Sequence, residues 1–111
     1  MISYDDFAKM DLRVGKVLSC EEIPKSRSLY KLMVDVGEEQ PRTILSGIKN
    51  WYSVEDLVDK FIIVLLNLKP RKMMGIESQG MLLAADVDDA AVLLKTDDTF
   101  KEKLKPGQKI Q

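Results

Sequence analysis

The sequence predicts an all-β fold, a small five-stranded barrel of roughly Greek-key type with short helices. Segments rich in apolar and β-branched residues recur at intervals of roughly 8 to 15 residues, which is typical of short strands in a barrel. A single short helical pattern interrupts them, between the third and the fourth segment. With 111 residues, of which 45% are hydrophobic, the chain is expected to form a single domain over residues 1–111.

The first elements are a short helix and a long strand. Ser3, followed by acidic residues, resembles an N-cap and predicts a helix as far as about Lys9. Residues 12–23 predict the first strand, in which Gly15 breaks the alternation and suggests a bulge. Pro24 ends this strand and opens a polar, basic loop.

The next two strands are predicted over residues 29–36 and 42–48. The first of them alternates regularly, with one face expected in the core: Tyr30, Leu32, Val34 and Val36. Met33 is also expected to fill the core, since methionine usually does. Gly47 in the third strand suggests a bulge or a close approach of another segment.

The second half of the chain alternates between strands and turns. Ser53 caps a helix predicted over residues 53–58, and the apolar segment 61–68 predicts a strand buried on both sides. Further strands are expected at 80–87, 91–94 and 109–111. Thr99 and Glu102 have the spacing of a capping box.

This order of elements, with a helix between the third and fourth strands, is that of the OB-fold. In that fold ligands lie on the face of strands 2 and 3, between the 1–2 and 4–5 loops. The first loop contains Lys25 and Arg27, and the second contains Lys69, Arg71 and Lys72. We therefore expect two basic loops, far apart in the sequence, to converge on one face.

The residue inventory argues against catalysis and against a metal or cofactor. Histidine is absent and Cys20 is the only cysteine, so the chain has neither a disulfide nor a cysteine–histidine metal cluster. Cys20 lies in a strand and is expected to be a structural thiol. Gly75 and Gly80 lack the Lys-Ser/Thr pair of a phosphate-binding loop. Asp86, Asp88 and Asp89 lack the glycine and the distal glutamate of a calcium loop. We therefore expect no enzyme activity, cofactor or metal.

The chain also lacks the features of a membrane or secreted protein. Its longest apolar run, residues 61–66, is far shorter than the roughly 18 residues needed to span a bilayer. The N-terminal residues are acidic and no apolar segment of a signal peptide follows them. We expect a cytoplasmic protein.

The net charge is only −1, but basic and acidic residues cluster in different segments of the chain. This separation allows a local basic surface and favours an RNA ligand. Phosphate groups require cations, which the predicted face supplies in Lys25, Arg27, Lys31, Arg42, Lys69, Arg71 and Lys72. Ser46, Asn67 and Ser78 would add polar groups, and Met73, Met74 and Met81 polarizable surface. Aromatic residues make up only 6%, which favours recognition of a folded RNA by shape over stacking on single strands.

Four segments of the chain, taken in order, resemble the tRNA-binding domain family: FAKMDLRVGKV, KSRSLYKLMVDVG, RTILSGI and VLLNLKPRKMMGIESQGMLLAA. That family includes stand-alone dimeric tRNA-binding proteins, the C-terminal domain of methionyl-tRNA synthetase, the EMAP-II precursor domain and CsaA-type export chaperones. The resemblance covers residues 7–110. It implies an OB-fold with terminal extensions that build a homodimer, and binding of the outside corner of the L-shaped tRNA.

The resemblance also implies roles for particular residues. Those that match the family's motifs and would contact RNA are Lys31, Arg42, Asn67, Ser78 and Met81. The family's basic loop corresponds to Lys69, Arg71 and Lys72. Gly80 also matches a family motif, but it is expected to allow a particular backbone conformation and not to contact RNA. An aminoacyl-tRNA synthetase is an expected partner. The low net charge leaves a second interpretation open, a CsaA-type chaperone that binds unfolded peptides.

Overall fold

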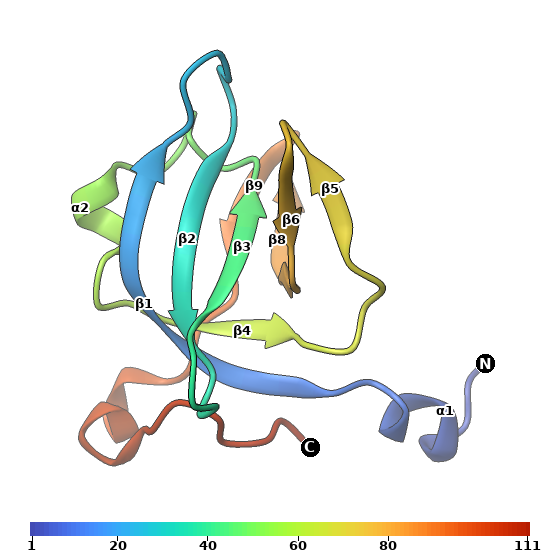
Figure 1. Cartoon of the computed structure of the whole chain (residues 1–111). Helices are drawn as coiled ribbons and strands as arrows, with labels where there is room; N and C mark the ends of the chain where they lie inside the picture. Colours follow the sequence, from blue (N-terminus) through green and yellow to red (C-terminus); the bar gives the residue numbers. More distant parts are fainter.

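The computed structural model describes residues 1–111, in which five antiparallel strands form a nearly closed OB-like barrel (Figure 1). The helices are α1 (Tyr4–Ala8), α2 (Val54–Leu57) and the 3₁₀ helix η1 (Asp98–Lys103). The strands are β1 (Leu12–Glu22), β2 (Tyr30–Asp35), β3 (Arg42–Ser46), β4 (Phe61–Leu65), β5 (Arg71–Met73), β6 (Ile76–Ser78), β7 (Met81–Leu82), β8 (Ala84–Val87) and β9 (Ala90–Leu93). The predicted all-β barrel with short helices is confirmed.

The barrel sheet has the strand order β3-β2-β1-β4-β7, and β1 is its longest member. The first half of β1, from Leu12 to Lys16, pairs with β4, and the second half, from Lys16 to Glu22, pairs with β2. One curved strand therefore serves two neighbours, which closes most of the barrel (Figure 1). Two hairpins, β5–β6 and β8–β9, stand beside it as separate two-stranded sheets.

Side chains alternate between the inner and the outer face along β2, and the inner face is the one that the sequence predicts. The residues expected on the inner face of the second strand, namely Tyr30, Leu32, Val34 and Val36, are all buried. Met33 does not fill the core: it points to the outer face, half-buried, where its sulfur accepts a hydrogen bond from the Thr43 hydroxyl at 3.5 Å. Its place between the inward-facing Leu32 and Val34 decides this, because neighbouring strand residues point to opposite faces.

Two glycines differ from their predicted roles. The register of β1 shifts between Val17 and Ser19, so the bulge lies there and not at Gly15. Gly15 instead allows close packing, since a Cβ at this position would lie 2.7 Å from Cγ1 of Val34. At Gly47 the expected close approach is absent, because a Cβ would meet no atom within 4 Å and β3 has already ended at Ser46.

The two predicted α-helices are confirmed with their caps. The side chains of Ser3 and Ser53 each accept a hydrogen bond from the backbone N–H three residues on, and the aspartate at that position accepts one from the backbone N–H of the serine. The 3₁₀ helix begins differently from the prediction. Its N-cap is Asp97, whose carboxylate accepts a bond from the N–H of Thr99, so Thr99 lies inside the first turn.

The chain termini cover the outer face of β1 and β4. A second apolar cluster, separate from the barrel core, joins Leu12, Val14, Ile63 and Leu65 to Phe7 of α1 and Ile110 of the C-terminal tail. The tail runs beside β1, donating from Ile110 N to Leu12 O at 2.9 Å. The strand predicted at 109–111 is reduced to an isolated bridge between Arg13 and Lys109.

The segment predicted as one strand over 80–87 is divided between two sheets. β7 pairs with β4, whereas β8 pairs with β9, and Leu83 separates them. The N–H of Leu83 still bonds to Ile63, but its carbonyl accepts from Leu94, which marks the transfer from one sheet to the other. No helix of the protein has the length and hydropathy that crossing a bilayer requires.

Candidate nucleic-acid interface

The basic segment after β4, predicted as a loop, is largely a β-hairpin. β5 and β6 are joined by the two-residue turn Met74–Gly75, in which both residues have positive φ, 52° and 77°. Such φ values define the type I′ turn, whose twist matches that of a two-stranded ribbon. The strand β5 therefore presents Arg71 and Lys72 with a defined direction for each, whereas Lys69 lies in the connection before it.

Alternation in the hairpin divides the predicted basic cluster. Arg71 pairs with Ser78, and Met73 pairs with Ile76, whereas Lys72 pairs with Glu77. Because neighbours in a strand point to opposite faces, Arg71 and Met73 share one face and Lys72 lies on the other with an acidic residue opposite. Lys72 is thus separated from Arg71 although it follows it in the chain.

The face of Arg71 and Met73 forms one wall of a groove of about 300 Å³. β3 and β7 form the other walls, and the end of the β1–β2 loop reaches the groove through Leu29. The lining residues are Leu29, Leu45, Ser46, Gly47, Leu68, Lys69, Arg71, Met73, Ser78, Gly80, Met81 and Leu82. We refer to this feature as the β3–β5 groove.

The β1–β2 loop lies at the same end of the molecule as the turn of the β5–β6 hairpin (Figure 1). Lys25 and Arg27 are exposed in this loop, and Leu29, at its end, lines the groove together with Met73. Lys31 lies on the outer face of β2, where its Cα partner in β3 is Leu45, another lining residue. The three cations therefore adjoin the groove without lining it.

The cations of this region form no ion pair within the protein. The ion pairs of the structure use other cations, among them Lys49 with Glu22 and Lys95 with Asp98. None of the following takes part in an ion pair: Lys25, Arg27, Lys31, Lys69, Arg71 and Lys72. Their charges are available to an anionic ligand.

Arg42 has a different environment from the one expected of an RNA-contacting residue. Its guanidinium forms a two-pronged ion pair with Glu38 and donates to the carbonyls of Leu66 at 2.8 Å and Gln79 at 2.9 Å. The hydrogen bond to Glu38 raises the pKa of Arg42 and lowers the pKa of Glu38. These four bonds give Arg42 a structural role, joining the β2–β3 turn to the segments that flank the hairpin.

Asn67 and Ser78 are also used inside the protein. The amide of Asn67 donates to Lys9 O at 2.6 Å and accepts from Asp11 N at 2.8 Å, which ties the end of β4 to the connection between α1 and β1. Ser78 is 5% exposed, and its hydroxyl accepts from Leu45 N and donates to Gly80 O. Both side chains therefore help to hold the fold together, since their polar atoms have partners within the protein, and their predicted contacts with RNA stay predictions.

The methionines divide into two environments. Met73 and Met81 line the groove, and Met81 remains 43% exposed there. Met74 lies at the tip of the hairpin, 50% exposed and outside the groove. The sequence had indicated Met73 and Met81, but not the apolar contributions of Leu29 and Leu68, because leucines at strand ends have the same sequence signal as core residues.

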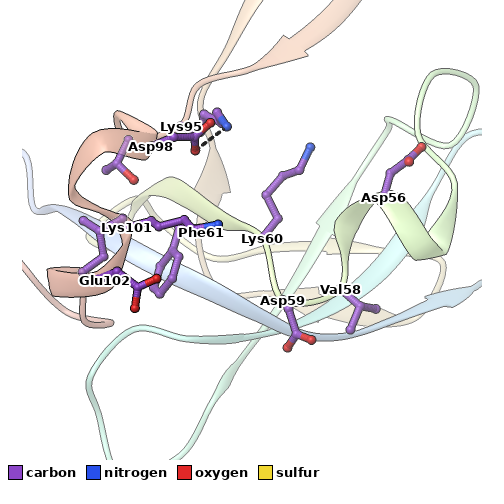
Figure 2. A pocket seen from close by; sticks show the side chains of 11 residues that line it. Asp56, Val58, Asp59, Lys60, Phe61, Lys95, Asp98, Lys101 and Glu102 are labelled. Carbon is purple, nitrogen blue, oxygen red and sulfur yellow. Dashed lines mark hydrogen bonds and ion pairs between the residues drawn. The ribbon is translucent and has the colours of Figure 1, made fainter.

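A larger hollow, of about 400 Å³, lies between α2, the start of β4 and η1. Figure 2 shows its mixed charge, with the Lys95–Asp98 ion pair at one side and Lys60 and Asp56 toward the other. Its acidic lining residues are Asp56, Asp59, Asp98 and Glu102. Carboxylates repel phosphate, so this hollow is electrostatically less suited to a polyanion than the β3–β5 groove.

Cys20 is buried in the barrel core and makes no site. Burial raises the pKa of its thiol to about 11, and the neighbouring Glu21 and Glu22 add to the shift. A thiol with so high a pKa is protonated at neutral pH and is a poor nucleophile. The protein contains no cluster of three or more side chains suited to holding a metal ion.

The nearly closed five-stranded barrel places the protein in the class of small OB-like β-barrel modules. Members of that class bind oligonucleotides or oligosaccharides on the face of strands 2 and 3. Residues 12–109 match the model of the family described as "Putative tRNA binding domain". The chain therefore belongs to the tRNA-binding domain family, as the sequence resemblance indicated.

Curated relatives include two methionine–tRNA ligases. The enzyme of Methanosarcina acetivorans is 49% identical over 110 residues, which are 99% of this chain and 15% of that protein. The enzyme of Thermotoga maritima is 50% identical over 109 residues, 98% of this chain and 16% of that protein. The chain thus corresponds to about 15% of the length of these ligases.

Solved structures similar over the whole chain include two further kinds of protein. The MetRS related protein from Pyrococcus horikoshii superimposes with a TM-score of 0.88 and 36% identity, covering 100% of this chain and 98% of that one. The CsaA chaperone protein from Picrophilus torridus superimposes with a TM-score of 0.87 and 30% identity, covering 100% of both chains.

Proposed function

We propose that this chain is a non-catalytic module, a single domain over residues 1–111, that binds tRNA by its shape at the outside corner of the L. Membership of the tRNA-binding domain family supports the ligand. The single observation that carries the site is the β3–β5 groove: in a protein of net charge −1, it is lined by Lys69 and Arg71, neither of which has an acidic partner.

The proposed site places cations around an apolar groove. Lys69 and Arg71 flank the groove, Lys31 adjoins it on β2, and Lys25 and Arg27 extend the surface into the β1–β2 loop. Each cation that neutralises a phosphate releases a condensed counterion, so binding is expected to weaken steeply with salt. Lys72, on the opposite face of the hairpin, is assigned a peripheral contribution.

The similarity to segments of methionine–tRNA ligases supports an accessory role. A second weak site on the same tRNA raises the effective concentration of that tRNA at a synthetase active site. We place this activity in the cytoplasm, with an aminoacyl-tRNA synthetase as partner. The module would act in translation and would not itself catalyse a reaction.

A homodimer forms part of the same proposal. The β8–β9 hairpin exposes Val87, Val92 and Leu94, which have relative exposures of 49%, 44% and 43%. A second copy of the chain could cover these apolar side chains. Phe7, in the N-terminal extension that the resemblance assigns to dimerisation, is half-buried against the chain's own apolar cluster and would contribute less to the interface.

A second candidate function, peptide binding by a chaperone, is favoured by the similarity to solved CsaA structures. The structure from Bacillus anthracis also superimposes over the whole chain, with a TM-score of 0.84 and 29% identity. The apolar part of the β3–β5 groove, with Met73 and Met81, would suit irregular peptide side chains, because methionine adapts its shape.

A salt titration separates the two functions. Filter binding of the chain to total tRNA is measured at rising salt concentrations, in parallel with binding to an unfolded peptide. The tRNA function predicts tight binding at low salt that weakens steeply as the salt is raised. Binding to the peptide that is indifferent to salt, with no binding to tRNA, would reject the tRNA function and favour the chaperone.

A further inference from the structure

The apolar lining of the β3–β5 groove is not explained by phosphate binding. Phosphates require cations and hydrogen-bond donors, but half of the lining is hydrophobic. Leu68 and Met81 remain 46% and 43% exposed within the groove, where they contact water in the free protein. Apolar side chains held open between cations indicate a ligand that has both an apolar part and a negative charge.

The groove also contains an unused polar group. The hydroxyl of Ser46 makes no hydrogen bond within the protein, whereas that of Ser78, in the same groove, makes two. A hydroxyl can both donate and accept a hydrogen bond. Ser46 can therefore bond to the polar edge of a ligand whose flat face lies against Met73, Met81 or Leu68.

The size of the groove restricts the ligand further. Its volume of about 300 Å³ is at the lower end of the range for small-molecule sites, so it can hold a nucleoside but not a helix. A double-stranded RNA could reach the flanking cations only by lying across the rim. The bases of single-stranded loops and bulges, in contrast, can leave the stack and enter a protein pocket.

We propose that the β3–β5 groove holds one unstacked nucleotide of a bound RNA. Its base packs against the side chains of Met73, Met81 and Leu68, with its polar edge toward Ser46. Lys69 and Arg71 bind the phosphates on either side of it. This inference rests on the proposed function and deepens it, since it names the part of a folded RNA that the module selects: a position where a base is already unpaired and extruded.

The test compares three RNA hairpins of equal length that differ at a single position. The position is fully paired in the first, carries a bulged adenosine in the second and carries a bulged abasic residue in the third. Dissociation constants for the full chain are measured by fluorescence anisotropy at one salt concentration. We expect the bulged adenosine to bind about tenfold more tightly than the other two, the size of a single base–side-chain contact.

Two methionine substitutions provide the matched pair. Met81→Ala removes an apolar wall of the groove, and it should abolish most of the preference for the bulged adenosine without changing the salt dependence, because no charge is lost. Met74→Ala removes a methionine of similar exposure at the tip of the hairpin, outside the groove. It should leave the preference intact.

The outcomes distinguish this inference from the proposed function. Equal, salt-dependent binding of all three hairpins would overturn the inference and leave RNA binding in place. Equal loss of the preference in both methionine variants would also overturn it. No binding of any of these RNAs or of tRNA at low salt would reject the proposed function and the inference together. Displacement of the RNA by an unfolded peptide, with weaker peptide binding by Met81→Ala, would assign the groove to peptides instead.

Discussion

Arg42 and Glu38 form a two-pronged ion pair, with Nε to Oε1 at 2.8 Å and Nη2 to Oε2 at 2.9 Å. The guanidinium also donates to the carbonyls of Leu66 and Gln79. Leu66 precedes the β5–β6 hairpin in the chain, and Gln79 directly follows it. One side chain therefore fixes both ends of the segment that presents Lys69 and Arg71.

Replacing Arg42 should affect stability more than direct contact with RNA. Arg42→Ala removes four charge-assisted hydrogen bonds, two of them to a carboxylate, and should lower the free energy of unfolding by about 2–3 kcal/mol. Urea denaturation measures this change. Unchanged stability of Arg42→Ala together with strongly weakened tRNA binding would contradict the structural role and show that Arg42 contacts the RNA.

The Arg42–Glu38 pair also predicts a pH dependence. The hydrogen bond from Arg42 holds the pKa of the Glu38 carboxyl below the ordinary glutamate value of 4.5. A carboxyl with a lowered pKa in the folded state stabilises the fold above its unfolded pKa, and this contribution is lost as the pH falls through the folded pKa. The contribution should therefore be complete at pH 7 and decrease only below about pH 4.5.

The Glu38→Gln variant isolates this effect. Its melting temperature should lie below that of the parent protein at pH 7, and the difference should shrink as the pH falls below 4.5. The other carboxylates with lowered pKa values, Asp56 and Asp97, are present in both proteins and cancel in the difference. A difference in melting temperature that stays constant down to pH 3 would contradict the assignment.

Two glycines provide a test of packing in the barrel. Gly15→Ala would place a Cβ 2.7 Å from Val34 and 3.0 Å from Val64, both buried, and should cost about 1–3 kcal/mol of stability. Gly47→Ala meets no atom within 4 Å and should change stability little. Thermal unfolding of the two variants makes the comparison. Equal stabilities would mean that Gly15 is not closely packed.

Removal of the Ser78 hydroxyl should destabilise the wall of the groove. In Ser78→Ala the buried N–H of Leu45 loses its acceptor, at a cost of about 1–3 kcal/mol. Ser28→Ala, at an exposed position of the β1–β2 loop, is the control and should be neutral. Denaturant titrations distinguish the two, and an unchanged midpoint for Ser78→Ala would disprove the structural role of this hydroxyl.

Substitution of single cations should show that the residues of the groove contribute more to tRNA binding than those outside it. Lys69→Ala and Arg71→Ala are each expected to weaken tRNA binding about fivefold and to reduce the slope of log K against log salt by about 1. Lys72→Ala should have a smaller effect, because Lys72 faces away from the groove. Filter binding at several salt concentrations gives both quantities.

Lys103→Ala is the matched control for these variants. Lys103 is exposed, has no ion pair and lies on η1, away from the β5–β6 hairpin (Figure 1). Its removal changes the net charge by the same amount and should leave tRNA affinity nearly unchanged. If Lys103→Ala weakened binding as much as Lys69→Ala does, the effect would reflect total charge, and the groove would lose its assignment.

Much of the fold could be predicted because its signals are local. The alternation in residues 30–36 reports which face is buried, and the serine caps at Ser3 and Ser53 depend on residues three positions on. The family resemblance rests on the order of such local segments. The places where prediction failed, such as the bulge in β1 and the division of residues 80–87, depend on pairing with distant strands.

By itself, the sequence determined an all-β barrel, its capped helices and two basic segments, since each depends on residues close together in the chain. Only the tertiary structure decided which polar groups remain available to a ligand. The partners that occupy Asn67 and Arg42 include residues 58 and 37 positions away, and no local pattern indicates such bonds. Lys72 likewise lies apart from Arg71 because the segment folds as a hairpin, and a strand directs neighbouring side chains to opposite faces.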